Sequence, residues 1–154
     1  MILGFKQHFP DKTPTYFVEK ILQPVNVALV LDVPKYYPID IEYKLPTKLH
    51  SIRKGNRWRA DMPIQMAYGV RTKKYWQFNK GIQQLSKCIS VQRIFITYGN
   101  EITVSVDGKR LSLREVLKLI KNDGITEDQF INWFFQKGTV EFSGQIIHWT
   151  NLRY

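Results

Sequence analysis

The stretch from Lys48 to Arg59 concentrates side chains that can do chemistry. Its sequence, KLHSIRKGNRWR, holds a histidine, a serine, a tryptophan and five cationic residues. A hydroxyl becomes a useful nucleophile when a neighbouring base takes its proton, whereas lysine and arginine bind phosphate. The stretch therefore indicates either a loop that contacts nucleic acid or the active-site loop of a small hydrolase.

A second basic stretch, VRTKKYWQFNKG, occupies residues 70–81. It interleaves cations with aromatic rings, namely Arg71, Lys73, Lys74, Tyr75, Trp76 and Phe78. Cations can neutralise phosphates while exposed rings stack on unpaired bases, each stack being worth about 1–3 kcal/mol. Alternatively, Trp76 and Phe78 point from a strand into the core. The exposure of the two rings distinguishes these alternatives.

The charge of the whole chain favours the same class of partner. The 154 residues carry a formal net charge of +10, with a pI near 9.7. Such a surface attracts phosphate-bearing molecules over the range of a Debye length. We therefore expect RNA or single-stranded nucleic acid as the partner, although a basic protein without this partner can have the same composition.

The cysteine and histidine content predicts no metal and no cofactor. Cys88 is the only cysteine, so no internal disulfide can form and a zinc site with several thiolate ligands is excluded. His8, His50 and His148 are far apart and lack metal-ligand spacing. There is also no long apolar N-terminal region and no run of roughly 20 apolar residues. These features predict a cytoplasmic protein that does not cross a membrane.

The elements around Lys48 to Arg59 must position its side chains. Residues 15–22 have the apolar spacing of a short helix. Residues 25–33 alternate with period two, which predicts a strand, and residues 35–45 predict an irregular arm or an edge strand. Residues 64–68 alternate again and predict a further strand.

The second half of the chain predicts a meander and two helices. Residues 94–98 and 102–106 alternate on either side of Gly99-Asn100, which suits a hairpin, and a second tight turn follows. Capping boxes begin at Ser112 and Thr126 and predict helices to about residue 121 and to near residue 138. A last strand follows at residues 146–149. One α+β domain over residues 1–154 is expected, built on a small, partly closed antiparallel barrel with flanking short helices.

The order of the motifs carries further information. A short helix, a Lys-x-x-Ser-x-Arg element from Lys48 to Arg53, a meander, a helix ending in Asp123-Gly124 and a last strand follow one another. This order resembles the ASCH domain family of the PUA-like superfamily, whose members are small β-barrels. The resemblance runs from about Thr15 to the end of the chain. Two departures stand out: residues 23–45 intervene before the lysine, which implies an insertion, and the family's usual glutamate is Asp123.

The resemblance implies recognition of RNA or of a modified nucleoside. One small bacterial branch of the family hydrolyses N4-acetylcytidine and related amides with a lysine, a threonine three residues later and a glutamate. Mapped by motif, these catalytic roles fall on Lys48, Ser51 and Asp123. Lys48 would take the proton of Ser51 if burial or Arg53 lowered its pKa, and Asp123 would orient the amine or protonate the leaving group.

Three hypotheses remain open. The first is a binding module in which residues 48–53 form the floor of a cleft and residues 56–59 its rim. Its nucleic-acid-binding residues would be His50, Arg53, Lys54, Arg57, Trp58, Arg59, Arg71, Lys73, Lys74 and Trp76. The second is an amidohydrolase that deacylates a nucleobase. The third is an accessory protein that binds another protein through Tyr36, Tyr37 and Tyr43.

Overall fold

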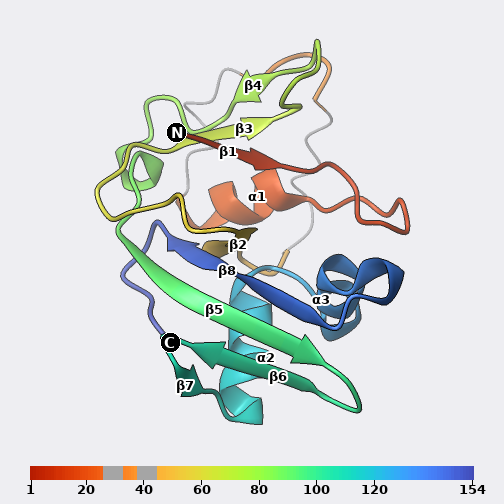
Figure 1. Ribbon diagram of the computed structural model, residues 1–154. Helices are drawn as coiled ribbons and strands as arrows, with labels where there is room; N and C mark the ends of the chain where they lie inside the picture. Colours follow the sequence, from red (N-terminus) through yellow and green to blue (C-terminus); the bar gives the residue numbers. More distant parts are fainter. Residues whose placement is uncertain (26–32, 38–44) are drawn as a thin grey trace.

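The structure is a computed structural model that describes residues 1–25, 33–37 and 45–154. These residues form eight strands in two sheets and three α-helices. Figure 1 shows a three-stranded sheet above helix α1 (Phe17–Leu22) and a five-stranded sheet below it. The α+β class is confirmed. Among the described residues the strands do not close into a barrel.

The three-stranded sheet has the order β1-β3-β4. Strand β1 (Ile2–Phe5) runs parallel to β3 (Gln65–Tyr68), which pairs antiparallel with β4 (Trp76–Gln77). Strand β3 confirms the prediction for residues 64–68. No element was predicted at β1, because its pairing partner β3 lies more than sixty residues further along the chain.

The five-stranded sheet is antiparallel throughout, with the order β2-β8-β5-β6-β7. Its strands are β2 (His50–Lys54), β5 (Ser90–Tyr98), β6 (Ile102–Val106), β7 (Lys109–Arg110) and β8 (Glu141–His148). The predicted hairpin is confirmed, with Tyr98 opposite Ile102. The interpretation of Lys48 to Arg59 as a loop is wrong for its first half, which pairs with β8.

The two predicted capping boxes are both present. Helix α2 (Leu113–Asn122) begins after Ser112, and helix α3 (Glu127–Phe134) begins after Thr126. Helix α3 ends earlier than expected and is followed by a short 3-10 helix, Gln136–Gly138. Other 3-10 helices are Gln23–Val25 and Gln83–Leu85. Most of the predicted strand at 25–33 and of the arm at 35–45, including Tyr43, lies outside the described residues.

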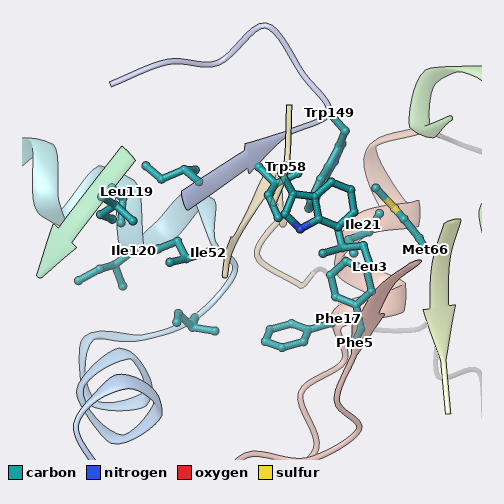
Figure 2. Close-up of a cluster of buried hydrophobic side chains, with 14 of the residues drawn as sticks. Leu3, Phe5, Phe17, Ile21, Ile52, Trp58, Met66, Leu119, Ile120 and Trp149 are labelled. Atoms are coloured by element: carbon teal, nitrogen blue, oxygen red, sulfur yellow. The ribbon is translucent and has the colours of Figure 1, made fainter. Parts of the chain in front are cut away.

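The core fills the space between the elements that carry the site. Figure 2 shows apolar side chains from β1, α1, β2, α2 and the segment after β8 gathered into one cluster. Within the cluster, Ile52 comes from β2 while Leu119 and Ile120 come from α2, and all three are buried. This packing fixes β2 against the end of α2. No helix in the described part of the chain is long and apolar enough to cross a membrane.

Candidate functional site

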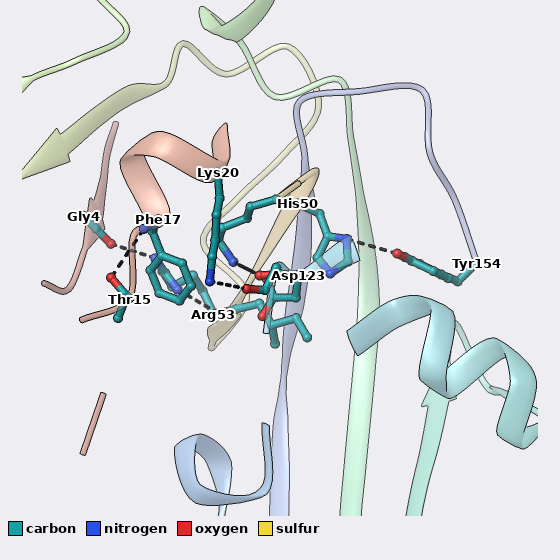
Figure 3. Close-up of polar contacts among 11 residues, drawn as sticks. Gly4, Thr15, Phe17, Lys20, His50, Arg53, Asp123 and Tyr154 are labelled. Atoms are coloured by element: carbon teal, nitrogen blue, oxygen red, sulfur yellow. Dashed lines mark hydrogen bonds and ion pairs between the residues drawn. The ribbon is translucent and has the colours of Figure 1, made fainter. Parts of the chain in front are cut away.

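Lys48 and Asp123 meet in the interior, although 75 positions separate them. Lys48 lies just before β2, and Asp123 is the C-cap of α2. The Lys48 ammonium forms an ion pair with Asp123 Oδ1 and donates to the Asp123 carbonyl oxygen at 2.8 Å. Figure 3 shows Asp123 with Lys20 and His50 beside it. The backbone reinforces the pairing, because Leu49 N–H donates to the Asn122 carbonyl at 2.8 Å.

Burial dominates the electrostatics of this pair. Lys48 is 2 % exposed and Asp123 is 5 % exposed. Desolvation lowers the pKa of Lys48 to about 8, against the opposing attraction of Asp123. Desolvation also raises the pKa of Asp123, although Lys48 and Arg53 act in the opposite direction. The two pKa shifts have the same cause, because a low-dielectric interior disfavours the charged form of each side chain.

Two more cations surround the same carboxylate. Lys20 donates to the Gly124 carbonyl at 2.7 Å, and Arg53 donates to the carbonyls of Gly4 at 2.7 Å and Ile52 at 3.0 Å. Gly124 has φ +73°, and a Cβ there would lie 3.0 Å from Lys48 Cβ, so this position suits glycine on both counts. Three cationic side chains, of which Lys20 and Lys48 are buried and Arg53 is half-buried, therefore lie close enough to Asp123 to lower its pKa.

An aromatic ring covers the Lys48 ammonium. The Lys48 Nζ lies 4.4 Å from the ring centroid of Phe17, a residue of α1. A cation over a ring face is stabilised by the ring quadrupole, more so when it is desolvated. Lys48, Ser51 and Asp123 line none of the three cavities described below. In this structure the predicted catalytic residues are thus closed off from solvent.

Ser51 is fully buried, and its hydroxyl has no hydrogen-bond partner among the described residues. Because side chains alternate along β2, Ser51 projects from the face opposite His50 and Ile52. Arg53, two residues further on, shares the face of Ser51. The hydroxyl is therefore free of competing hydrogen bonds but has no access to solvent.

His50 belongs to a hydrogen-bonded chain that the sequence did not predict. Its Nδ1 lies 3.1 Å from the Tyr154 hydroxyl, which accepts a hydrogen bond from Asn122 Nδ2 at 3.0 Å. Burial and Lys48 hold the pKa of His50 well below its usual value, so the ring is neutral. The other ring nitrogen, Nε2, lies 3.8 Å from Asp123 Oδ1. No local pattern could have linked Tyr154 to this site.

The predicted nucleic-acid contacts divide into exposed and buried residues. The exposed ones are Lys54, Arg57, Arg59, Arg71, Lys73 and Lys74. His50 is fully buried, and the Arg53 side chain is occupied by backbone carbonyls. The expectation that both contact nucleic acid directly is therefore not met in this conformation. Residues 56 and 57 are exposed, as expected for a rim, and so is Arg59.

The two predicted stacking tryptophans are placed differently from the expectation. Trp58 is 5 % exposed and belongs to the core, so its assignment to an exposed rim is wrong. The Gln145 side chain explains this, because it accepts from Trp58 N–H at 3.0 Å and donates to the Trp58 carbonyl at 3.1 Å. Trp76 is half-buried and packs with its ring centroid 5.1 Å from that of Tyr37. The core interpretation thus holds for Phe78, which is 1 % exposed, and partly for Trp76.

In the described part of the chain, no group of three or more histidine, cysteine, aspartate or glutamate side chains is arranged to hold a metal ion. Comparison of the chain with protein-family models, with curated proteins and with solved structures gives no match.

Proposed function

We propose that this protein is an ASCH-like domain of the PUA-like superfamily that binds RNA or a modified nucleoside. The observation that carries the proposal is the buried Lys48–Asp123 pair. It joins the Lys-x-x-Ser-x-Arg element to the Asp-Gly at the end of α2, the two motifs on which the resemblance depends. A chance match of motifs gives no reason for these two residues to meet.

The surface beside this pair has the chemistry of a nucleic-acid contact. A cavity of about 440 Å³ is lined by two exposed cations, Lys6 and Lys54, and by Trp133 among its aromatic residues. The Lys6 ammonium lies 5.3 Å from the centroid of the Trp133 ring. Cations that follow a backbone and rings that stack on bases are the usual components of a single-strand site. Lys6 also lines two neighbouring cavities, which supports an extended ligand.

Fluorescence anisotropy with a labelled single-stranded RNA tests the proposal. The affinity should fall as salt concentration rises, with a slope of roughly −0.7 in log K against log salt for each phosphate neutralised. An unlabelled RNA of the same length serves as the competitor and should displace the labelled probe. Absence of binding at low salt, or an affinity that salt does not change, would overturn the proposal.

A second candidate function is hydrolysis of an N4-acylcytidine by Lys48, Ser51 and Asp123. Two observations favour it: the pKa of Lys48 is lowered to about 8, and the Ser51 hydroxyl has no partner among the described residues. A lysine with such a pKa is partly unprotonated near neutral pH and can act as a base. The substrate would have to displace the Phe17 ring, since the ammonium is covered.

An assay of purified protein with N4-acetylcytidine tests this second candidate. Release of acetate should be abolished by Lys48→Ala and by Ser51→Ala, with circular dichroism verifying that each variant is folded. If the wild-type protein releases no acetate from N4-acetylcytidine supplied in large molar excess, the hydrolase is excluded and the binding function stands alone.

A further inference from the structure

Strand β5, the central strand of the five-stranded sheet, presents an aromatic ring to solvent. Figure 1 shows helix α2 behind β5 and β6, and the side chains of Ile94 and Ile96 are buried in the core. Because side chains alternate along a strand, Arg93, Phe95 and Thr97 project from the opposite face of the sheet. Phe95 is 43 % exposed on that face. Its ring can therefore be reached by a ligand without any rearrangement.

The cross-strand neighbours of Phe95 are small. Phe95 lies opposite Ser143 of β8 on one side and opposite Ser105 of β6 on the other. Directly opposite side chains on one face of an antiparallel pair have Cβ atoms about 4.5–5.5 Å apart, so large residues at these two positions would pack against the ring and cover it. The two serines leave the ring exposed and place hydroxyl groups beside it that can donate to or accept from a ligand.

The exposed arginines of the proposed rim lie on the same face of the sheet. Gln145 of β8 lies opposite Arg93 of β5. The Gln145 side chain accepts from Trp58 N–H at 3.0 Å and donates to the Trp58 carbonyl at 3.1 Å. The segment that carries Arg57 and Arg59 therefore crosses the sheet beside Arg93. All three arginines are exposed.

Charge distinguishes the two sides of Phe95. The three arginines lie near Gln145 on one side of the ring, whereas Glu141, which is exposed, lies on the other side. An anionic backbone is attracted to the arginine side and repelled at the glutamate side, and the net charge of +10 adds to the attraction. A phosphate chain held by the arginines would thus place a base next to the Phe95 ring.

The apolar surface of this face is too small for a stable protein interface. Of the strands in this sheet, only β5 contributes a large exposed apolar side chain, that of Phe95. A specific interface between proteins usually buries at least about 1,000 Å² around an apolar core of several residues. A single ring flanked by hydroxyl groups and arginines instead suits one stacked base.

We propose that this face binds single-stranded RNA, with one base stacked on the ring of Phe95. The three arginines hold the adjoining phosphates. Every base has a π face, so the stack adds affinity without selecting a sequence. The inference rests on the proposed function, because it adds a base contact to the RNA-binding surface that the exposed arginines form.

Fluorescence anisotropy of the full chain with two labelled oligonucleotides of equal length tests the inference. One is oligouridylate, and the other is an abasic ribose-phosphate chain; the wild-type protein should bind the oligouridylate more tightly. Phe95→Leu keeps an apolar side chain but removes the ring, and should weaken oligouridylate binding about fivefold or more, the usual effect of losing one stacked base. It should leave the affinity for the abasic chain and the salt slope unchanged, because no charge is removed.

Two further variants serve as controls. Phe95→Tyr keeps the ring and should bind both oligonucleotides as the wild-type protein does. Leu117→Ala removes an apolar side chain of α2 that is 44 % exposed, and should likewise have no effect on either affinity. Wild-type affinity of Phe95→Leu for oligouridylate, or equal weakening of its binding to both chains, would overturn the inference and leave the proposed function intact.

Sedimentation of the wild-type protein tests whether a second copy covers this face instead. The protein should be monomeric at the concentrations used for RNA binding. A dimer that Phe95→Leu dissociates would overturn the inference, because the ring would then be buried between two copies. If the wild-type protein binds neither oligonucleotide, the proposed function fails together with the inference.

Discussion

The buried Asp123 carboxylate lies among three cationic side chains, those of Lys48, Lys20 and Arg53. Lys48 is paired with it directly, and Lys20 and Arg53 lie close enough to influence its pKa. An ion pair in the interior gains Coulomb energy but loses hydration, so its net effect on stability is small while both partners are present. Removal of one partner is far more costly, because the other charge is left buried.

Asp123→Ala should therefore lower the free energy of unfolding by about 3–5 kcal/mol, measured by urea denaturation. Asp128→Ala, at an exposed position in the first turn of α3, should cost less than about 1 kcal/mol. The double variant Lys48→Met/Asp123→Leu should recover much of the loss, because it leaves no unpaired charge. Equal destabilisation by Asp123→Ala and Asp128→Ala would show that the buried pair is unimportant.

The lowered pKa values of Lys20 and Lys48 predict that stability rises between about pH 8 and pH 10. Both are lowered to about 8 from the usual 10.5. In this window the folded protein releases these protons while the unfolded chain retains them, so the unfolded state binds more protons and the free energy of unfolding increases with pH. Well below pH 8 both lysines are protonated in both states and contribute no slope.

Urea denaturation at several pH values measures this dependence. The slope should approach but not exceed about 1.4 kcal/mol per pH unit for each lysine. Above about pH 10 the raised pKa values of Tyr37 and Tyr154 act in the opposite direction, because the unfolded chain then ionises first. The Lys48→Met/Asp123→Leu variant should have a shallower rise. A rise of the same steepness in that variant would contradict the assignment to Lys48.

At the scale of elements, the pairing of β2 with β8 positions the site. Gly144 of β8 lies opposite Lys54 of β2, and a Cβ at Gly144 would collide with the Arg53 carbonyl and lie 2.9 Å from the Phe142 ring. Gly144→Ala should therefore force the strands apart and cost about 1–3 kcal/mol in urea denaturation. Gly99→Ala is the control, since a Cβ there meets nothing within 4 Å. Similar costs for both substitutions would argue against close packing at Gly144.

The elements whose signals are local were predictable from the sequence. The capping boxes at Ser112 and Thr126 gave the starts of α2 and α3, and alternation around Gly99-Asn100 gave the β5–β6 hairpin. Strand β1 was missed because its partner β3 lies more than sixty residues away. Strand β2 was missed because polar side chains in a strand buried on both faces hide the apolar pattern.

The candidate site was predictable only in part, because its contacts join residues that are far apart in the sequence. The motif resemblance placed Lys48 and Asp123 in one site, and the structure joins them. It could not indicate that Phe17 covers the ammonium, since that contact depends on how α1 packs. Nor could a basic stretch reveal that Gln145, 87 positions away, binds the backbone of Trp58 and holds it in the core.

At the scale of the whole molecule, the exposed cations near β2 link the fold to the proposed function. Lys54 ends β2, and Arg57 and Arg59 follow it on the surface. Because Lys48 is buried and Arg53 is bound to backbone carbonyls, the exposed cations after them are the ones placed to contact phosphate. An RNA backbone bound there should depend on them, whereas cations on the outer face of α2 should not contribute.

The most direct test of the central claim is the salt dependence of RNA binding by paired variants. Arg57→Ala/Arg59→Ala should weaken binding and reduce the slope of log K against log salt by up to about 1.4, which corresponds to two phosphate contacts on a single strand. Arg114→Ala/Lys118→Ala removes the same charge from exposed positions of α2 and should leave the slope unchanged. Identical slopes for the two double variants would contradict an RNA-binding surface beside β2.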